Sequence, residues 1–377
     1  MPGSFSREQV MFSFSMMADL SAGQIGLEVD IEVPLAAHYA DILTTFSAQL
    51  GSWELVWGPA VRVPNPVSPP ANTMFVVRGV DDPRRVVVAI AGTNPFSAFD
   101  WLIEDARVRI QRDWTIGNPA AGLTPKIANG TDSGLSILLS MMPGPGVQGV
   151  GTRLSDFLRS LPPGPLDICV TGHSLGGALA PALALWLNDS TPAWDATGRA
   201  QLSCVAFAGP TPGNGDFATY YASTPLGLRT TRIHNSLDVV PHAWASADLD
   251  EVSGLYDPPI VPDLLIKGLA RLARLISSQG DYAHVVPDAP AFAGEVMTSP
   301  GLLTLLTPFL HFIAELTHQH VDAYFAELEI PDDLQTAFEQ IRDSVHLLGA
   351  QGEIAGYAKR LASALAAHFP SEFPFLG

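Results

Sequence analysis

The sequence predicts an α/β fold in which a mostly parallel central sheet carries helices on both faces. Apolar, β-prone segments alternate with helical ones along the chain, as they do where parallel strands are joined by helices. Three of these segments, residues 85–91, 166–170 and 202–207, are apolar almost throughout, which is typical of strands covered on both faces. The 377 residues, 47% of them hydrophobic, suffice for one large domain with insertions.

The other elements follow from apolar spacing and from the turn residues between segments. Pro34 suits the first turn of a helix that Gly51 ends, whereas residues 1–33 show no clear pattern. In chain order we expect helices over 34–50 and 132–142, strands over 53–57, 73–77 and 229–234, and helices over 264–279, 302–328, 334–348 and 353–369.

The helix predicted over 264–279, with Asp263 as its cap, is basic and amphipathic in an otherwise acidic chain. Its apolar face carries Leu265, Leu269, Leu272 and Ile276. Its other face carries Lys267, Arg271 and Arg274. We expect it to pack on the body with a solvated charged face, with binding to a lipid surface as the alternative.

Charge and hydropathy limit the partners and the location. The formal net charge is −18, so nucleic acid is excluded as a partner, because phosphate binding needs clustered Lys and Arg. No apolar run reaches the roughly 18 residues of a transmembrane segment, and no basic region precedes a long apolar core at the N-terminus. We therefore expect a soluble protein without a signal peptide, cytoplasmic rather than secreted, with Cys169 and Cys204 as buried thiols.

Residues 171–177, with the sequence TGHSLGG, predict the centre of the site. An apolar strand precedes them and an Ala- and Leu-rich helix follows, which is the context of a G-x-S-x-G nucleophile elbow. Ser174 is then the nucleophile, and the backbone N–H of Leu175 is one donor of the oxyanion hole. The alternative is a serine in a glycine-rich turn that only joins a strand to a helix.

A serine nucleophile needs a histidine base and a carboxylate that orients it, here in the chain order Ser, acid, His. Asp238 follows the next strands at the start of a loop, and Asp248 and Asp250 are poorer candidates. Among the ten histidines, His173 should point away from Ser174, His234 precedes the acid, His242 follows it too closely and His311 suits the core. His284, His318 and His320 remain as candidate bases.

Four blocks in order resemble the class 3 (fungal-type) triacylglycerol lipase family of the α/β-hydrolase fold. They are residues 88–93 followed by 100–105, the elbow at 170–180, the F-A-G-P-T-P-G-N block at 207–214, and 232–241, which ends in D-V-V-P. The resemblance implies that Asp238 is the acid and that Thr93 is the second oxyanion donor. It also favours His320 over His318 and His284 as the base, because Tyr324 and Phe325 after it are similar to the family's H-x-x-Y-F ending.

The resemblance implies a lipid-ester hydrolase that works through an acyl-enzyme, with a short-chain carboxylesterase or a phospholipase of the same fold as the alternative. A catalytically inactive lipid-binding protein is the reading from another class. No metal or cofactor is needed, and oligomeric state leaves no signal. We expect a single domain over 1–377 with its core at 34–242 and 281–330, a cap insertion at 243–280, C-terminal helices at 331–377, and a lid near 94–101.

Overall fold

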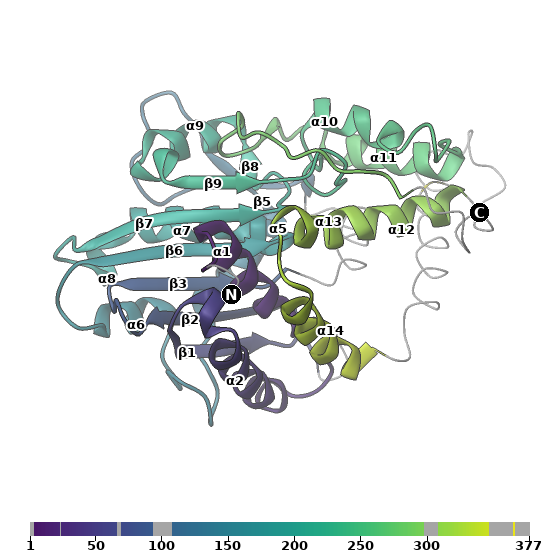
Figure 1. The fold of residues 1–377 in the computed structure, drawn as a ribbon. Helices are drawn as coiled ribbons and strands as arrows, with labels where there is room; N and C mark the ends of the chain where they lie inside the picture. Colours follow the sequence, from purple (N-terminus) through teal and green to yellow (C-terminus); the bar gives the residue numbers. More distant parts are fainter. Residues whose placement is uncertain are drawn as a thin grey trace.

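The computed structural model describes residues 4–22, 24–65, 69–92, 108–297 and 308–346, together with residue 365. At its centre is a six-stranded sheet in the order β1-β2-β3-β6-β7-β9 (Figure 1). The strands are β1 (Trp53–Arg62), β2 (Asn72–Gly79), β3 (Arg85–Ile90), β6 (Leu166–His173), β7 (Ala200–Phe207) and β9 (Thr230–Ile233). The last four run parallel to one another, and β2 runs antiparallel to both of its neighbours, β1 and β3. The predicted fold class is confirmed.

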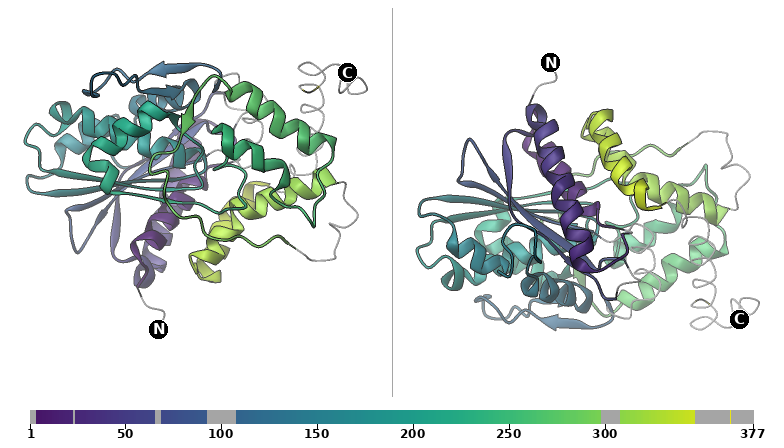
Figure 2. Two further views of the ribbon diagram at one scale, coloured as in Figure 1. Left: turned by 90° about the horizontal axis from the view of Figure 1, so that it is seen from above. Right: turned by 90° about the horizontal axis from the view of Figure 1, so that it is seen from below.

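Helices cover both faces of the sheet (Figure 2). On β3, Val86 and Val88 belong to the core beneath α5 (Asn129–Ser140) and α7 (Leu175–Asp189). Val87, between them, belongs to the opposite core, beneath α1 (Arg7–Asp19) and α2 (Glu28–Thr45). Successive side chains of a strand point to opposite faces, so a strand covered on both sides is apolar at every position.

Helix α1 lies across the sheet, where the sequence pattern indicated no element (Figure 1). Every residue from Val10 to Ala18 is buried, so the helix has no polar face and shows no amphipathic period. A local signal does exist at its start. The Ser6 hydroxyl accepts from the Gln9 N–H and the Gln9 side chain accepts from the Ser6 N–H, which is a capping box.

One predicted helix boundary is wrong. Helix α2 begins at Glu28 and carries Pro34 inside it, because burial of Ile31 and Leu35 on the sheet outweighs one missing backbone bond. The helical pattern expected over 302–328 is confirmed in its described part, which contains two helices, α12 (Pro308–His320) and α13 (Asp322–Glu327). They are separated at Val321, whose φ of −125° and ψ of −66° are not helical.

A third core lies beside the sheet, where α10 (Ser246–Glu251) and α11 (Leu264–Ser277) pack with α12. Asp263 accepts hydrogen bonds from two N–H groups of the first turn of α11, so the predicted cap is confirmed. The predicted packing of this helix on the body is also confirmed, since Leu269 and Leu272 are buried. None of the described helices is long and apolar enough to cross a membrane.

The remaining elements connect these layers. A small sheet, in the order β10-β8-β5-β4, joins segments that are far apart in the chain. Its strands are β4 (Gln111–Asp113), β5 (Lys126–Ala128), β8 (Gly213–Asn214) and β10 (Tyr282–Ala283). The further helices are α3 (Ser47–Leu50), α6 (Leu154–Ser160), α8 (Thr191–Trp194), α9 (Gly215–Ser223), η2 (Pro225–Leu228), η3 (Val252–Gly254) and α14 (Asp332–His346). The flap predicted at 94–101 lies outside the described residues, and so does the helix predicted at 353–369 apart from residue 365.

Candidate active site

Ser174 lies in the tight turn between β6 and α7, as the motif predicts. Its φ of 59° and ψ of −124° form a backbone conformation that residues with a side chain rarely adopt. The turn brings backbones into close contact, because a Cβ added to Gly172 would lie 2.4 Å from the Gly176 carbonyl oxygen. The glycines of the motif are therefore required by the sharp turn that holds Ser174.

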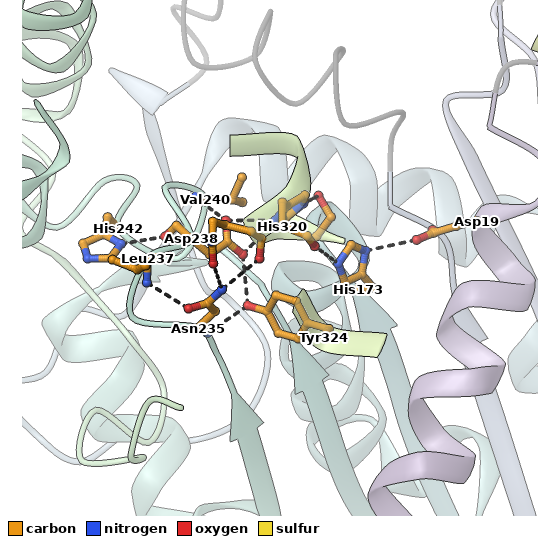
Figure 3. A network of polar contacts seen from close by, with 11 residues as sticks. Asp19, His173, Asn235, Leu237, Asp238, Val240, His242, His320 and Tyr324 are labelled. Atoms are coloured by element: carbon orange, nitrogen blue, oxygen red, sulfur yellow. Dashed lines mark hydrogen bonds and ion pairs between the residues drawn. The ribbon is translucent and has the colours of Figure 1, made fainter. Parts of the chain in front are cut away.

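Three side chains from distant parts of the chain meet at this turn, and Figure 3 shows two of them, His320 and Asp238, side by side. His320, the last residue of α12, places Nε2 at 2.8 Å from the Ser174 Oγ. Its Nδ1 lies 2.8 Å and 3.0 Å from the two carboxylate oxygens of Asp238. All three residues are at most 2% exposed, so water does not compete for these contacts. The structure thus joins Ser174, His320 and Asp238 in one hydrogen-bonded chain.

The loop after β9 holds Asp238 in place. The backbone N–H of Val240 donates to Oδ1 at 3.0 Å, and the Tyr324 hydroxyl donates to Oδ2 at 2.9 Å. The Asn235 N–H in turn donates to the Tyr324 oxygen at 3.0 Å. Burial, and then the charge of Asp238, raise the pKa of Tyr324 well above its ordinary value, so the hydroxyl stays protonated. Together the donors compensate for burying a carboxylate.

The competing candidates lie elsewhere. His318 is partly exposed and pairs with Asp322 at 3.2 Å. His284 makes a hydrogen bond of 2.8 Å to the carbonyl oxygen of Pro241. Of the three histidines that the sequence left open, His320 is the one whose ring lies between a serine and a carboxylate.

The alternative acids are engaged on the surface side of the third core. Asp250 pairs with Arg274, and about half of each side chain is exposed. Asp248 lies 3.8 Å from His284 with its side chain 40% exposed. Neither position resembles the fully buried environment of Asp238.

One of the two expected oxyanion donors, Leu175, lies in the described part of the chain. Leu175 is the first residue of α7, so its N–H has no partner in a preceding helical turn and lies at the positive end of the helix dipole. Gly92, after β3, lies against the elbow, because a Cβ added to it would be 2.9 Å from the Ser174 Cβ. Thr93 itself lies outside the described residues.

Sequence reasoning missed two polar partners of the site. Asp19, at the end of α1, contacts His173 at 3.1 Å, and no local motif marks it. Tyr324 was noted for its place after His320, but its bond to Asp238 was not expected. Within the described ranges, no group of three or more His, Cys, Asp or Glu side chains could hold a metal ion.

Comparison with known proteins agrees with this geometry. A family model described as Lipase (class 3) matches residues 87–247. The crystal structure of M37 lipase superposes with a TM-score of 0.80 at 30% identity, over 91% of this chain and 99% of that one. Lipase II from Rhizopus niveus is a remoter match, with a TM-score of 0.40 at 18% identity over 65% of this chain and 78% of that one. A search of curated proteins finds no match.

Proposed function

The chain belongs to the class 3 lipase family, with the α/β-hydrolase fold, and we propose that Ser174, His320 and Asp238 are its catalytic triad. The protein is a carboxylic-ester hydrolase whose function is that of a triacylglycerol lipase. The observation that carries the residue assignment is the unbroken contact from Ser174 Oγ through both ring nitrogens of His320 to Asp238.

In this proposal Asp238 accepts a hydrogen bond from Nδ1–H of His320, which leaves the lone pair of Nε2 facing the Ser174 hydroxyl. His320 takes the hydroxyl proton as Ser174 Oγ attacks the carbonyl carbon of the ester. The protonated ring then gives that proton to the leaving alcohol oxygen, and an acyl-enzyme forms. Water attacks the acyl-enzyme by the same proton route and releases the fatty acid.

The tetrahedral intermediate carries negative charge on the former carbonyl oxygen. We assign the Leu175 N–H as one donor because it begins α7 beside Ser174. We assign Thr93 as the other on the family resemblance alone. Removing one such donor in a related mechanism costs roughly 100- to 1000-fold in kcat.

We further propose that the substrate is met at a lipid–water interface, since long-chain triacylglycerols form a separate phase. The third core would form the cap of the site, as expected for residues 243–280. Support comes from its position, because Val239 and Ala243, on the loop that holds Asp238, are part of that core.

The first test compares Ser174→Ala and His320→Ala with the matched control His318→Ala. We expect the first two to lower kcat by at least about 10⁴-fold, because the residues of a triad act together and the loss of one disables the others. His318→Ala should stay within about twofold of the parent, since His318 contacts Asp322 instead. The assignment would be refuted if Ser174→Ala kept its activity. It would also be refuted if His318→Ala lost activity and His320→Ala kept it.

The second test measures rates on esters of increasing chain length, from soluble p-nitrophenyl esters to emulsified triacylglycerol. Higher turnover on the emulsion, rising once an interface forms, would support action at a lipid surface. Activity confined to short soluble esters would contradict the interfacial part of the proposal and leave the triad intact.

A further inference from the structure

His173, the residue before Ser174, has a hydrogen-bond acceptor at each of its ring nitrogens (Figure 3). Nδ1 lies 3.1 Å from a carboxylate oxygen of Asp19, and Nε2 lies 2.8 Å from the carbonyl oxygen of His320. The residue is 1% exposed, so water does not substitute for either contact. A neutral imidazole has a single N–H, and neither an ionised carboxylate nor a carbonyl oxygen can donate. Both contacts are satisfied together only when His173 is doubly protonated.

The surroundings favour that positive charge. His320 is the last residue of α12, so its carbonyl has no partner within the helix and lies at the negative end of the helix dipole. Burial by itself would lower the pKa of His173, but the hydrogen bond and charge of Asp19 outweigh it, and the pKa is raised. The other titratable groups that face His173, or line the small cavity beside it, are Asp238, His320, Asp322, Tyr324 and Glu339.

Asp19 makes two contacts, one with each carboxylate oxygen. Oδ2 faces His173, and Oδ1 accepts from the Gly92 N–H at 2.5 Å. Gly92 itself lies against Ser174. A carboxylate in the last turn of a helix is disfavoured by the helix dipole, so helix preference does not explain an acid at the end of α1. The contacts of Asp19 with His173 and Gly92 do explain its position.

These contacts tie together four elements around the catalytic serine. Asp19 belongs to α1, Gly92 follows β3, His173 ends β6 and His320 ends α12. The rings of His173 and His320 lie with centroids 4.7 Å apart. The main chain that carries the base is therefore bonded to the side chain next to the nucleophile.

We propose that Asp19 is a positioning residue that holds His173 as an imidazolium and thereby fixes the main chain of His320 relative to Ser174. The proposal rests on the triad assigned above. Asp19 does not touch the substrate, and it acts through His173 and the Gly92 backbone. The pair of Asp19 and His173 thus sets the distance between base and nucleophile.

The variant that tests it is Asp19→Asn, which keeps an oxygen for the Gly92 N–H but removes the charge facing His173. We expect kcat to fall roughly 10- to 100-fold, because small displacements of reacting groups are costly, while KM for a soluble ester changes less than about twofold. Asp322→Asn is the matched control, since Asp322 lines the same cavity but pairs with His318. It should keep the parent kcat.

Rates are expressed per active site titrated with a fluorophosphonate, so unfolded protein does not enter the comparison. If the probe fails to label Ser174 in the parent enzyme, the triad proposal fails. If labelling is normal and Asp19→Asn keeps the parent kcat, only the role of Asp19 is refuted.

A direct readout uses the parent enzyme with ¹⁵N-labelled histidine. In a pH titration, one ring should give the signal of two protonated nitrogens up to a higher pH than an ordinary histidine does. That signal should disappear in Asp19→Asn and in His173→Gln. Its absence from the folded parent would overturn the proposal without reliance on any variant.

Discussion

Two buried histidines flank the triad, and their environments shift their pKa values in opposite directions. His173, on the α1 side, faces Asp19 and a helix-terminal carbonyl, and its pKa is raised. His284, on the side of the third core, is 9% exposed, and its pKa is lowered to about 3. Burial is the largest cause for His284, followed by the nearby Arg232 guanidinium.

Both rings are buried, so the groups beside each ring decide which of the two carries a charge. Asp19 lies within hydrogen-bond distance of its histidine, whereas Asp248 is 3.8 Å from His284 and 40% exposed. His234 behaves like His284, since burial and Arg232 lower its pKa to about 4. One flank of the site is therefore held by an ion pair and the other by neutral rings.

The largest expected effect separates the two acids. Asp19→Ala should lower the free energy of unfolding by about 3 kcal/mol, because it leaves His173, which is 1% exposed, without the charge that compensates its own. Asp248→Ala should cost less than about 1 kcal/mol, since its carboxylate is solvated. Denaturant unfolding at pH 7 measures both. Equal losses of stability in the two variants would show that the two acids do not differ as described.

The pH dependence of stability should have opposite slopes on the two flanks. For His284 and His234 the folded pKa lies below the ordinary 6.5, so their contribution is complete above pH 6.5 and is lost as the pH falls toward 4 and 3. For His173 the folded pKa is raised, so its contribution is complete below pH 6.5 and is lost as the pH rises through the folded value.

Unfolding between pH 4 and pH 9 can resolve these slopes. His284→Gln should flatten the acid side of the profile, and His173→Gln should flatten the alkaline side. Two variants with the same profile would show that the flanks do not differ as described.

A smaller effect tests the contact between the flanks. Tyr324→Phe removes the donor to Asp238 and the acceptor of the Asn235 N–H, so we expect a loss of about 1 kcal/mol in stability and about tenfold in kcat. Tyr282→Phe is the matched control, because that buried hydroxyl donates to the Val108 carbonyl at 2.7 Å, away from Asp238. It should lose similar stability and keep kcat. Equal kcat values in the two variants would argue against a role for Tyr324.

The sequence predicted the features of the site that depend on local order. The turn at Ser174 and the strand and helix around it lie within one short stretch, and strict apolar composition marks the strands covered on both faces. The interpretation of residues 264–279 as a packed helix was also correct, since its apolar spacing matches the buried face of α11.

The missed features depend on distant contacts. Asp19 and His173 are 154 positions apart, and nothing near either residue indicates the pair. Helix α1 is buried on every side, so its sequence lacks the alternation of apolar and polar faces by which helices are predicted. His320 could be favoured over His318 only by resemblance, because both lie at the end of one helix and only the fold decides which ring faces Ser174.

The burial of α1 also determines when a newly made chain can become active. In its first turn, the Gln9 side chain donates to the Leu328 carbonyl at 2.8 Å. In its middle, the Met11 carbonyl accepts from the Thr171 hydroxyl. Helix α1 is thus held by contacts with segments that are synthesised after it, one of them more than 300 residues later. A nascent chain on the ribosome cannot bring His320 onto Ser174 before residues 320–328 emerge, so the enzyme cannot hydrolyse esters until that segment has been made.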